Sequence, residues 1–132
     1  LVVKLMNQKK FTHSLKSICS DELSQDDVDM LWQLLNFNHG KAVLPKLICY
    51  MRERKQHRAL WVGALQKTQV PLHLINGLID PISGAHLVER FRQLVPGGVV
   101  TELDGVGHYP QVESPGDVAD AFMQYIKNNL SN

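Results

Sequence analysis

The second half of the chain alternates between two hydrophobic periods. Nearly continuous apolar runs occupy residues 70–76 and 99–103, and both are too short for helices. Such runs are typical of strands that are covered on both faces of a parallel sheet. Between them, apolar residues recur at helical spacing over 85–95, and the sequence "PGG" ends that segment. The pattern predicts a strand, a helix and a second strand.

A final helix follows the second predicted strand. Ser114 is a good N-cap, Pro115 suits the first helical position, and Asp117 completes a capping box. Five apolar residues then form the predicted buried stripe: Val118, Ala121, Phe122, Tyr125 and Ile126. The order strand, helix, strand, helix favours two neighbouring parallel strands with helices packed against them, because such crossovers are right-handed. The fold class predicted from this half is α/β.

The first 66 residues show only helical spacing. Ser24 and Asp27 form a capping-box-like start for a helix that we expect to end at Gly40. A second helix is predicted near Leu44, because Pro45 is tolerated in a first turn, and a third around 58–65. The apolar positions of these helices are interpreted as packing surface: Val28, Leu31, Trp32, Leu35, Leu44, Leu47, Ile48, Met51 and Trp61.

Composition and charge narrow the classes of function. The 132 residues are 44% hydrophobic and 20% charged, which is typical of one soluble globular domain rather than a disordered or membrane-spanning chain. A net charge of +1 gives no overall field for nucleic acid or an anionic membrane, and the basic run over 52–58 is expected to be a solvated helix face. No metal-ligand spacing surrounds Cys19 or Cys49, so we expect no metal and two buried thiols in a reducing cytoplasm. With no signal peptide and no initiating methionine, the chain is expected to be part of a longer protein.

Two polar residues mark the predicted sheet edge. Asp80 follows the first predicted strand and His108 the second, and functional side chains gather where parallel strands end. A carboxylate that accepts from one ring nitrogen fixes the tautomer and leaves the other nitrogen as a base. Gly105 and Gly107 allow the loop to turn the ring inward, and Pro110 stiffens its exit. The sequence therefore predicts an acid–base pair.

Other polar side chains have more ordinary interpretations. His73 is expected to be a hydrogen-bonded residue of the core or sheet edge, and His86 to lie near the site or in solvent at a helix start. Glu113 is interpreted as a structural carboxylate that favours the N-terminus of the last helix. Tyr109 is a candidate pocket residue.

The segments "LINGLIDP" and "GVGHYPQVESP" resemble the C-terminal part of an α/β-hydrolase. The progression "LWVGAL", "IDP", "HYPQVESP" is most similar to the haloalkane dehalogenase and epoxide hydrolase branch, which includes the mesoderm-specific transcript proteins. The resemblance implies that residues 67–132 are the C-terminal part of the hydrolase core and residues 1–66 a helical cap or lid. It also implies that Asp80 is the acid and His108 the base of a catalytic triad. Tyr50 would lie in the cap, where epoxide hydrolases keep tyrosines, although it also fits ordinary helix packing.

The sequence departs from the family pattern at the nucleophile. A strand-to-helix elbow such as G-x-S-x-G is missing, since neither Ser83 nor Ser114 has the paired glycines. We therefore expect an N-terminal half of the same hydrolase to carry a serine or aspartate nucleophile and to be the partner of this chain. The expected reaction is hydrolysis of an ester or related bond in a small organic substrate, without a cofactor. A non-catalytic relative that acts as a protein-interaction module is the alternative.

Overall fold

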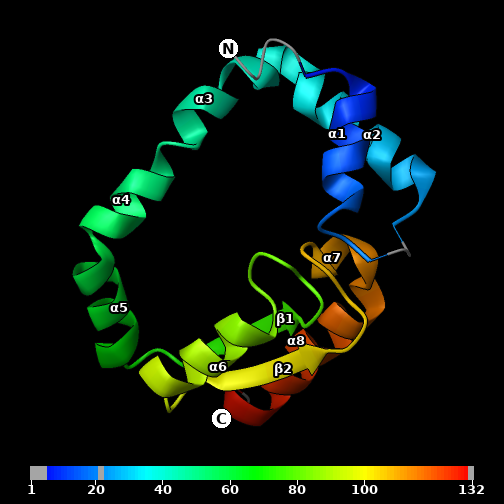
Figure 1. Cartoon of the computed structure of the whole chain (residues 1–132). Helices are drawn as coiled ribbons and strands as arrows, with labels where there is room; N and C mark the ends of the chain where they lie inside the picture. Colours follow the sequence, from blue (N-terminus) through cyan, green and yellow to red (C-terminus); the bar gives the residue numbers. More distant parts are fainter. Residues whose placement is uncertain (1–5, 21–22, 131–132) are drawn as a thin grey trace.

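The computed structural model describes residues 6–20 and 23–130. Figure 1 shows its elements. In chain order they are α1 (Gln8–Lys16), α2 (Gln25–Asn36), η2 (Phe37–Ala42), α3 (Leu44–Leu47), α4 (Tyr50–Gln56), α5 (Arg58–Lys67), β1 (His73–Gly77), α6 (Ala85–Leu94), β2 (Val99–Leu103), α7 (Pro110–Glu113) and α8 (Pro115–Leu130). The molecule is mostly helical and contains a two-stranded parallel sheet.

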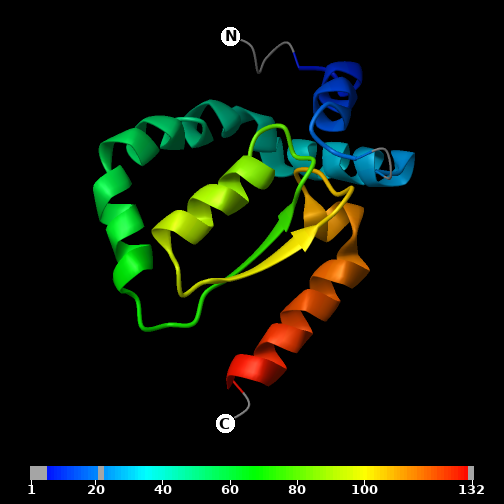
Figure 2. The ribbon, with the colours of Figure 1, turned by 60° about the horizontal axis from the view of Figure 1, so that its bottom comes forward.

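The sheet confirms the predicted order of strand, helix, strand and helix. β1 and β2 pair in parallel, with a register that runs from His73 opposite Val99 to Gly77 opposite Leu103. Helix α6 connects them, and α6 and α8 lie on opposite sides of the strands (Figure 2). The first strand begins later than residue 70, because Val70 donates its amide to the Thr68 side chain and Pro71 has no amide hydrogen.

The predicted helix starts are confirmed, whereas one predicted end is wrong. The Ser24 hydroxyl accepts from the Asp27 amide at 3.1 Å, and the Ser114 hydroxyl lies 2.5 Å from the Asp117 carboxylate. Helix α2 ends at Asn36, before the expected stop at Gly40. Asn38 and His39 adopt left-handed φ values of 47° and 60°, a conformation for which both residue types are enriched. This local preference ends the regular helix early.

The main apolar cluster joins the N-terminal helices to the segment after β2. It is built on Leu15, Leu23 and Val28, all nearly inaccessible to solvent. Tyr109 and Val112 pack against it from the loop and helix that follow β2. These contacts connect α1 and α2 to the loop that carries His108 and to α7.

Helices α3, α4 and α5 form an arc that leads away from this cluster (Figure 1). Part of the apolar stripe that was interpreted as packing surface is not covered by the described residues, because Leu47 and Ile48 are 61% and 62% exposed. Trp61 is also exposed, whereas Trp32 is half-buried and contacts Phe11 with ring centroids 5.4 Å apart. The basic run on α4 and the start of α5 is exposed, as expected of a solvated helix face.

Two smaller expectations also need correction. Cys19 and Cys49 are free thiols, as predicted, but both are half-buried rather than buried. Phe122, placed on the buried stripe of α8, is largely exposed, whereas Tyr125 on the same helix is buried. Within the ranges that the structure describes, no helix is both long and apolar enough to cross a membrane.

Candidate active site

Asp80 lies in the loop that follows β1, with its side chain only 4% exposed. One carboxylate oxygen, Oδ1, accepts from the Ile82 amide at 2.8 Å, and the other, Oδ2, accepts from the Ser83 hydroxyl at 2.5 Å. Aspartate often forms such local turns by accepting from an amide two residues ahead. The loop therefore folds around its own carboxylate and holds it at the carboxyl end of β1.

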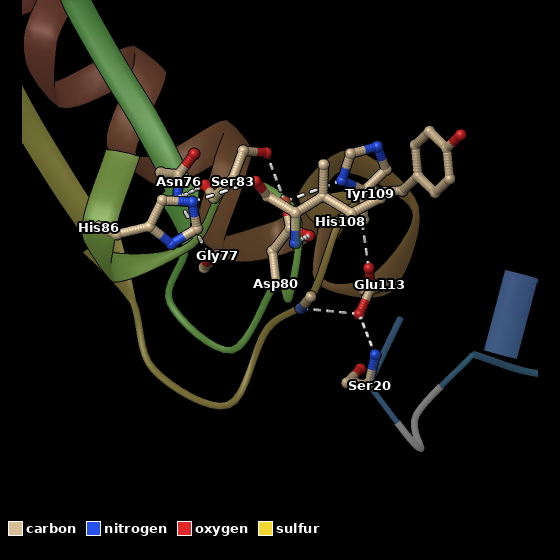
Figure 3. A network of polar contacts seen from close by, with 11 residues as sticks. Ser20, Asn76, Gly77, Asp80, Ser83, His86, His108, Tyr109 and Glu113 are labelled. Atoms are coloured by element: carbon tan, nitrogen blue, oxygen red, sulfur yellow. Dashed lines mark hydrogen bonds and ion pairs between the residues drawn. The ribbon is translucent and has the colours of Figure 1, made fainter. Parts of the chain in front are cut away.

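His108 lies in the loop that follows β2 and reaches the same carboxylate. Its Nδ1 is 2.8 Å from Asp80 Oδ2, across 28 residues of sequence (Figure 3). The imidazole side chain is 26% exposed. A neutral ring that donates from Nδ1 carries its lone pair on Nε2, the atom that can act as a base. The structure thus brings together the two residues that the strand order predicted at one edge.

The environment keeps Asp80 ionised. Burial opposes the negative charge, but hydrogen bonds from Ser83, Ile82 and His108 outweigh burial and hold the pKa of Asp80 below its ordinary value of 3.8. The carboxylate is therefore charged at neutral pH. A charged acceptor stabilises an imidazolium beside it more strongly than a neutral one would.

Glycines bring the two loops into backbone contact. A Cβ on Gly77 would lie 2.3 Å from the Gly107 carbonyl oxygen, and one on Gly107 would lie 2.7 Å from the Cys19 Cα. Gly105 has a φ of +71°, which glycine adopts easily. Gly107 was also predicted to supply conformational freedom, but among the described glycines only Gly105 has positive φ. Gly107 is required instead because other backbone approaches it too closely for a side chain.

Glu113 has a larger role than the sequence suggested. Its Oε2 accepts from the Ser20 amide at 2.6 Å and the Gly107 amide at 2.9 Å, while Oε1 accepts from the Tyr109 amide at 2.8 Å. Burial opposes ionisation of Glu113, but these bonds hold its pKa below the ordinary value of 4.5. It is the last residue of α7, a helix that sequence reasoning missed. The spacing of glutamate five residues after histidine was the available signal.

The other two histidine candidates and Tyr50 make other contacts than the one between Asp80 and His108. His73 bonds Thr101 through Nε2 at 2.9 Å and stacks on Tyr125, in agreement with a residue of the sheet core. His86 contacts the Ile82 carbonyl through Nε2 at 3.0 Å, so it supports the Asp80 loop. Tyr50 is 47% exposed and lies under the Arg54 guanidinium.

An apolar cavity of about 350 Å³ lies beside the histidine loop. Its lining comes from α1, α2 and the segment after His108: Phe11, Leu15, Leu31, Leu35, Tyr109, Gln111 and Val112. Tyr109 connects the cavity to the pair, because its ring meets the His108 ring edge-on with centroids 4.8 Å apart. Ligand cavities are commonly of this size and mostly apolar. Among the described residues, no group of three or more metal-ligating side chains is arranged around a common point.

Sequence comparison finds relatives under two names, LipZ and the mesoderm-specific transcript protein. LipZ of Mycobacterium tuberculosis, which is provisionally named a hydrolase, is 34% identical over 128 residues, covering 96% of this chain and 44% of LipZ. The mesoderm-specific transcript protein of Mus musculus is 31% identical over 132 residues, covering 97% of this chain and 39% of that protein. The human homologue of that protein is 30% identical over the same length.

These similarities cover nearly all of the chain but only part of each relative. The chain spans about two fifths of the length of the curated relatives it matches, 44% of LipZ and 39% of the mesoderm-specific transcript protein. No family model matches the sequence, and no solved structure matches it.

Proposed function

We propose that this chain is the C-terminal part of an α/β-hydrolase, with residues 1–66 as the helical cap and 67–132 as part of the core. In this proposal Asp80 is the acid and His108 the base of a catalytic triad. The observation that carries the proposal is the 2.8 Å contact between His108 Nδ1 and the buried Asp80 carboxylate at the carboxyl edge of a parallel sheet. The similarity to LipZ supports it.

The nucleophile is expected on an N-terminal half of the same protein, which is the proposed partner. With a serine nucleophile, His108 would take the serine proton, protonate the leaving group and then activate water. With an aspartate nucleophile, His108 would activate the water that hydrolyses the ester intermediate. In both reactions the ionised Asp80 stabilises the imidazolium, so the role of His108 as a base is the same.

The substrate is proposed to be a small organic ester, or a compound with a related bond, that carries an apolar group. The cavity beside Tyr109 supports an apolar group, because side chains such as Leu31 and Leu35 line it. We also propose a cytoplasmic location, for which the free thiols of Cys19 and Cys49 are the support.

The proposal can be tested in the intact protein that contains this sequence. Asp80→Asn should lower turnover of a reactive short-chain ester or epoxide by about 10⁴-fold, the loss seen when the orienting acid of a serine protease is replaced. His108→Gln should lower turnover at least as much. Asp104→Asn is the matched control, because Asp104 is an exposed carboxylate in the histidine loop. Circular dichroism would verify that each variant is folded.

The pattern of results separates the possibilities. A serine-reactive phosphonate that labels the intact protein would assign a serine nucleophile, and turnover without labelling would favour an aspartate. Full activity in a folded Asp80→Asn variant would contradict the proposed acid. Absence of turnover in the wild-type protein, together with no labelling, would contradict the hydrolase function and favour a non-catalytic relative.

A further inference from the structure

Glu113 fixes the main chain on both sides of His108. Gly107 and Tyr109 are the two sequence neighbours of His108, and their amides donate to Oε2 and Oε1 of Glu113 at 2.9 and 2.8 Å. The amide of His108 itself donates to the Ile18 carbonyl at 3.0 Å. Three consecutive amides therefore have defined acceptors, and the backbone that carries the imidazole is held at each residue. Figure 3 shows Glu113 together with Ser20, His108 and Tyr109.

The same carboxylate ties this loop to the segment between α1 and α2. The Ser20 amide donates to Glu113 Oε2 at 2.6 Å, from 93 residues away in the sequence. Since Ile18 accepts from His108 and Ser20 donates to Glu113, the segment 18–20 and the loop 107–113 contact each other at two points. Gly107 allows this approach, because a Cβ there would lie 2.7 Å from the Cys19 Cα.

Only a carboxylate can satisfy these donors. Glu113 is 8% exposed, and an ionised carboxylate has two oxygens with about four lone-pair positions, so it can accept from all three amides at once. A glutamine of the same shape offers one oxygen and one NH₂ group. Whichever way its amide is turned, the NH₂ group faces at least one amide donor of Ser20, Gly107 or Tyr109, which then has no acceptor.

We propose that Glu113 is a positioning residue that holds His108 Nδ1 on Asp80 by fixing the backbone of residues 107–109 against the segment 18–20. This inference rests on the proposed function for its kinetic consequence. It does not depend on the identity of the nucleophile. Displacing a catalytic group by about 1 Å can lower a rate by about 10²-fold, and this is the effect expected from loss of the Glu113 contacts.

The test compares Glu113→Gln with wild type and with Asp104→Asn in the intact protein. Asp104 provides a matched control, because it is an exposed carboxylate in the same loop. The first measurement is the proton NMR resonance of His108 Nδ1–H in its bond to Asp80, assigned by its disappearance in His108→Gln. The second is the separate determination of kcat and KM for a short-chain ester or epoxide. The third is the thermal unfolding midpoint.

The expected result is that Glu113→Gln broadens or shifts the Nδ1–H resonance and lowers kcat about 10²-fold with KM nearly unchanged. Asp104→Asn should leave all three measurements unchanged. An unchanged resonance and kcat in a folded Glu113→Gln variant, even with a lower unfolding midpoint, would overturn the proposal and leave Glu113 a purely structural role.

The proposal stays testable if Glu113→Gln does not fold and if the wild-type protein shows no turnover. If Glu113→Gln does not fold, the shorter Glu113→Asp, which keeps the charge but cannot reach all three amides, is measured in the same way, and an unchanged resonance there overturns the proposal. If the wild-type protein turns over no substrate, the hydrolase proposal fails, but the NMR resonance still tests whether Glu113 positions His108.

Discussion

At the scale of single residues, the site depends on which hydrogen-bond donors each carboxylate oxygen of Asp80 and Glu113 accepts from. Asp80 uses Oδ1 to hold its own loop and Oδ2 to meet both Ser83 and His108. Glu113 uses both oxygens on main-chain amides. One carboxylate thus orients the imidazole ring and the other orients the backbone from which the ring projects.

Cys19 offers a prediction about reactivity at this scale. Burial, the charge of Glu113 and a hydrogen bond to it, and the charge of Asp80 raise the pKa of the Cys19 thiol from 9.0 to about 12. Its thiolate fraction near neutral pH is then about 10³-fold lower than for an ordinary thiol, and only the thiolate is a good nucleophile. We expect iodoacetamide to alkylate Cys19 very slowly in the folded protein and rapidly after unfolding in urea.

Peptide mass spectrometry of a Cys49→Ser variant would follow alkylation at Cys19 alone. Replacing Glu113 by glutamine removes the neighbouring negative charge and should accelerate the reaction in the folded state. Equal alkylation rates in folded and unfolded protein would contradict the environment described for Cys19.

The sequence predicted the Asp80–His108 pair but not the contacts of Glu113. The pair follows from strand order, because parallel neighbours end at one edge and each residue lies in the loop that follows its strand. The Glu113 contacts depend on Ser20, 93 residues earlier, and on backbone amides that give no residue-specific signal. Local sequence identified Glu113 only as a carboxylate near a helix start.

At the scale of elements, glycines set the distance between the β1 and β2 loops. The Ile79 amide donates to the Val106 carbonyl at 3.1 Å, and the Leu78 amide to the Leu103 carbonyl at 3.0 Å. These bonds extend the pairing of the strands beyond their ends. The loops that carry Asp80 and His108 therefore continue the sheet rather than leaving it separately.

A glycine substitution series tests this arrangement. Gly77→Ala would place a Cβ within 2.4 Å of two carbonyl oxygens, those of Gly107 and Val106, so the backbone must move. We expect a loss of about 2 to 3 kcal/mol in the free energy of unfolding, as overpacking typically produces. Gly116→Ala is the control, because nothing lies within 4 Å of a Cβ there and alanine favours the first turns of α8.

Urea unfolding of the two variants and wild type would measure the difference. The control should match wild type or exceed its stability by up to about 1 kcal/mol. A Gly77→Ala variant as stable as the control would show that the two loops are farther apart than described.

Element boundaries were less predictable than element types. The alternating apolar runs identified both strands and α6, whereas the end of α2 required the left-handed conformations of Asn38 and His39. α7 was missed because its four residues are too few to show a period. The stripe on α3 and α4 was read correctly as apolar, but spacing alone does not say what it faces.

At the scale of the whole molecule, two buried carboxylates link stability to pH. The folded-state pKa values of Asp80 and Glu113 both lie below their ordinary values of 3.8 and 4.5. In each case the unfolded chain takes up a proton before the folded one as the solution becomes more acidic. The stability that these two carboxylates contribute is therefore present above pH 4.5. It is lost as the pH falls through the pKa values that the two groups have in the folded protein.

This linkage predicts the acid behaviour of the protein. The free energy of unfolding should fall steeply below pH 4.5 in wild type and less steeply in Glu113→Gln, which has one shifted carboxyl group fewer. Urea titrations across this range, followed by circular dichroism, would give the two slopes. Equal slopes would contradict a lowered pKa for Glu113.

The bonds of the site also differ in how much chain they enclose. The contact between Asp80 and His108 closes a loop of 28 residues, which contains one helix between the two strands. The contact between Ser20 and Glu113 closes a loop of 93 residues. The longer closure costs about 1 kcal/mol more in chain entropy. During folding, His108 should therefore contact Asp80 within the strand–helix–strand unit before the segment 18–20 packs against the histidine loop. The Glu113 carboxylate would receive its Ser20 donor last, so assembly of the candidate site ends where the two halves of the chain meet.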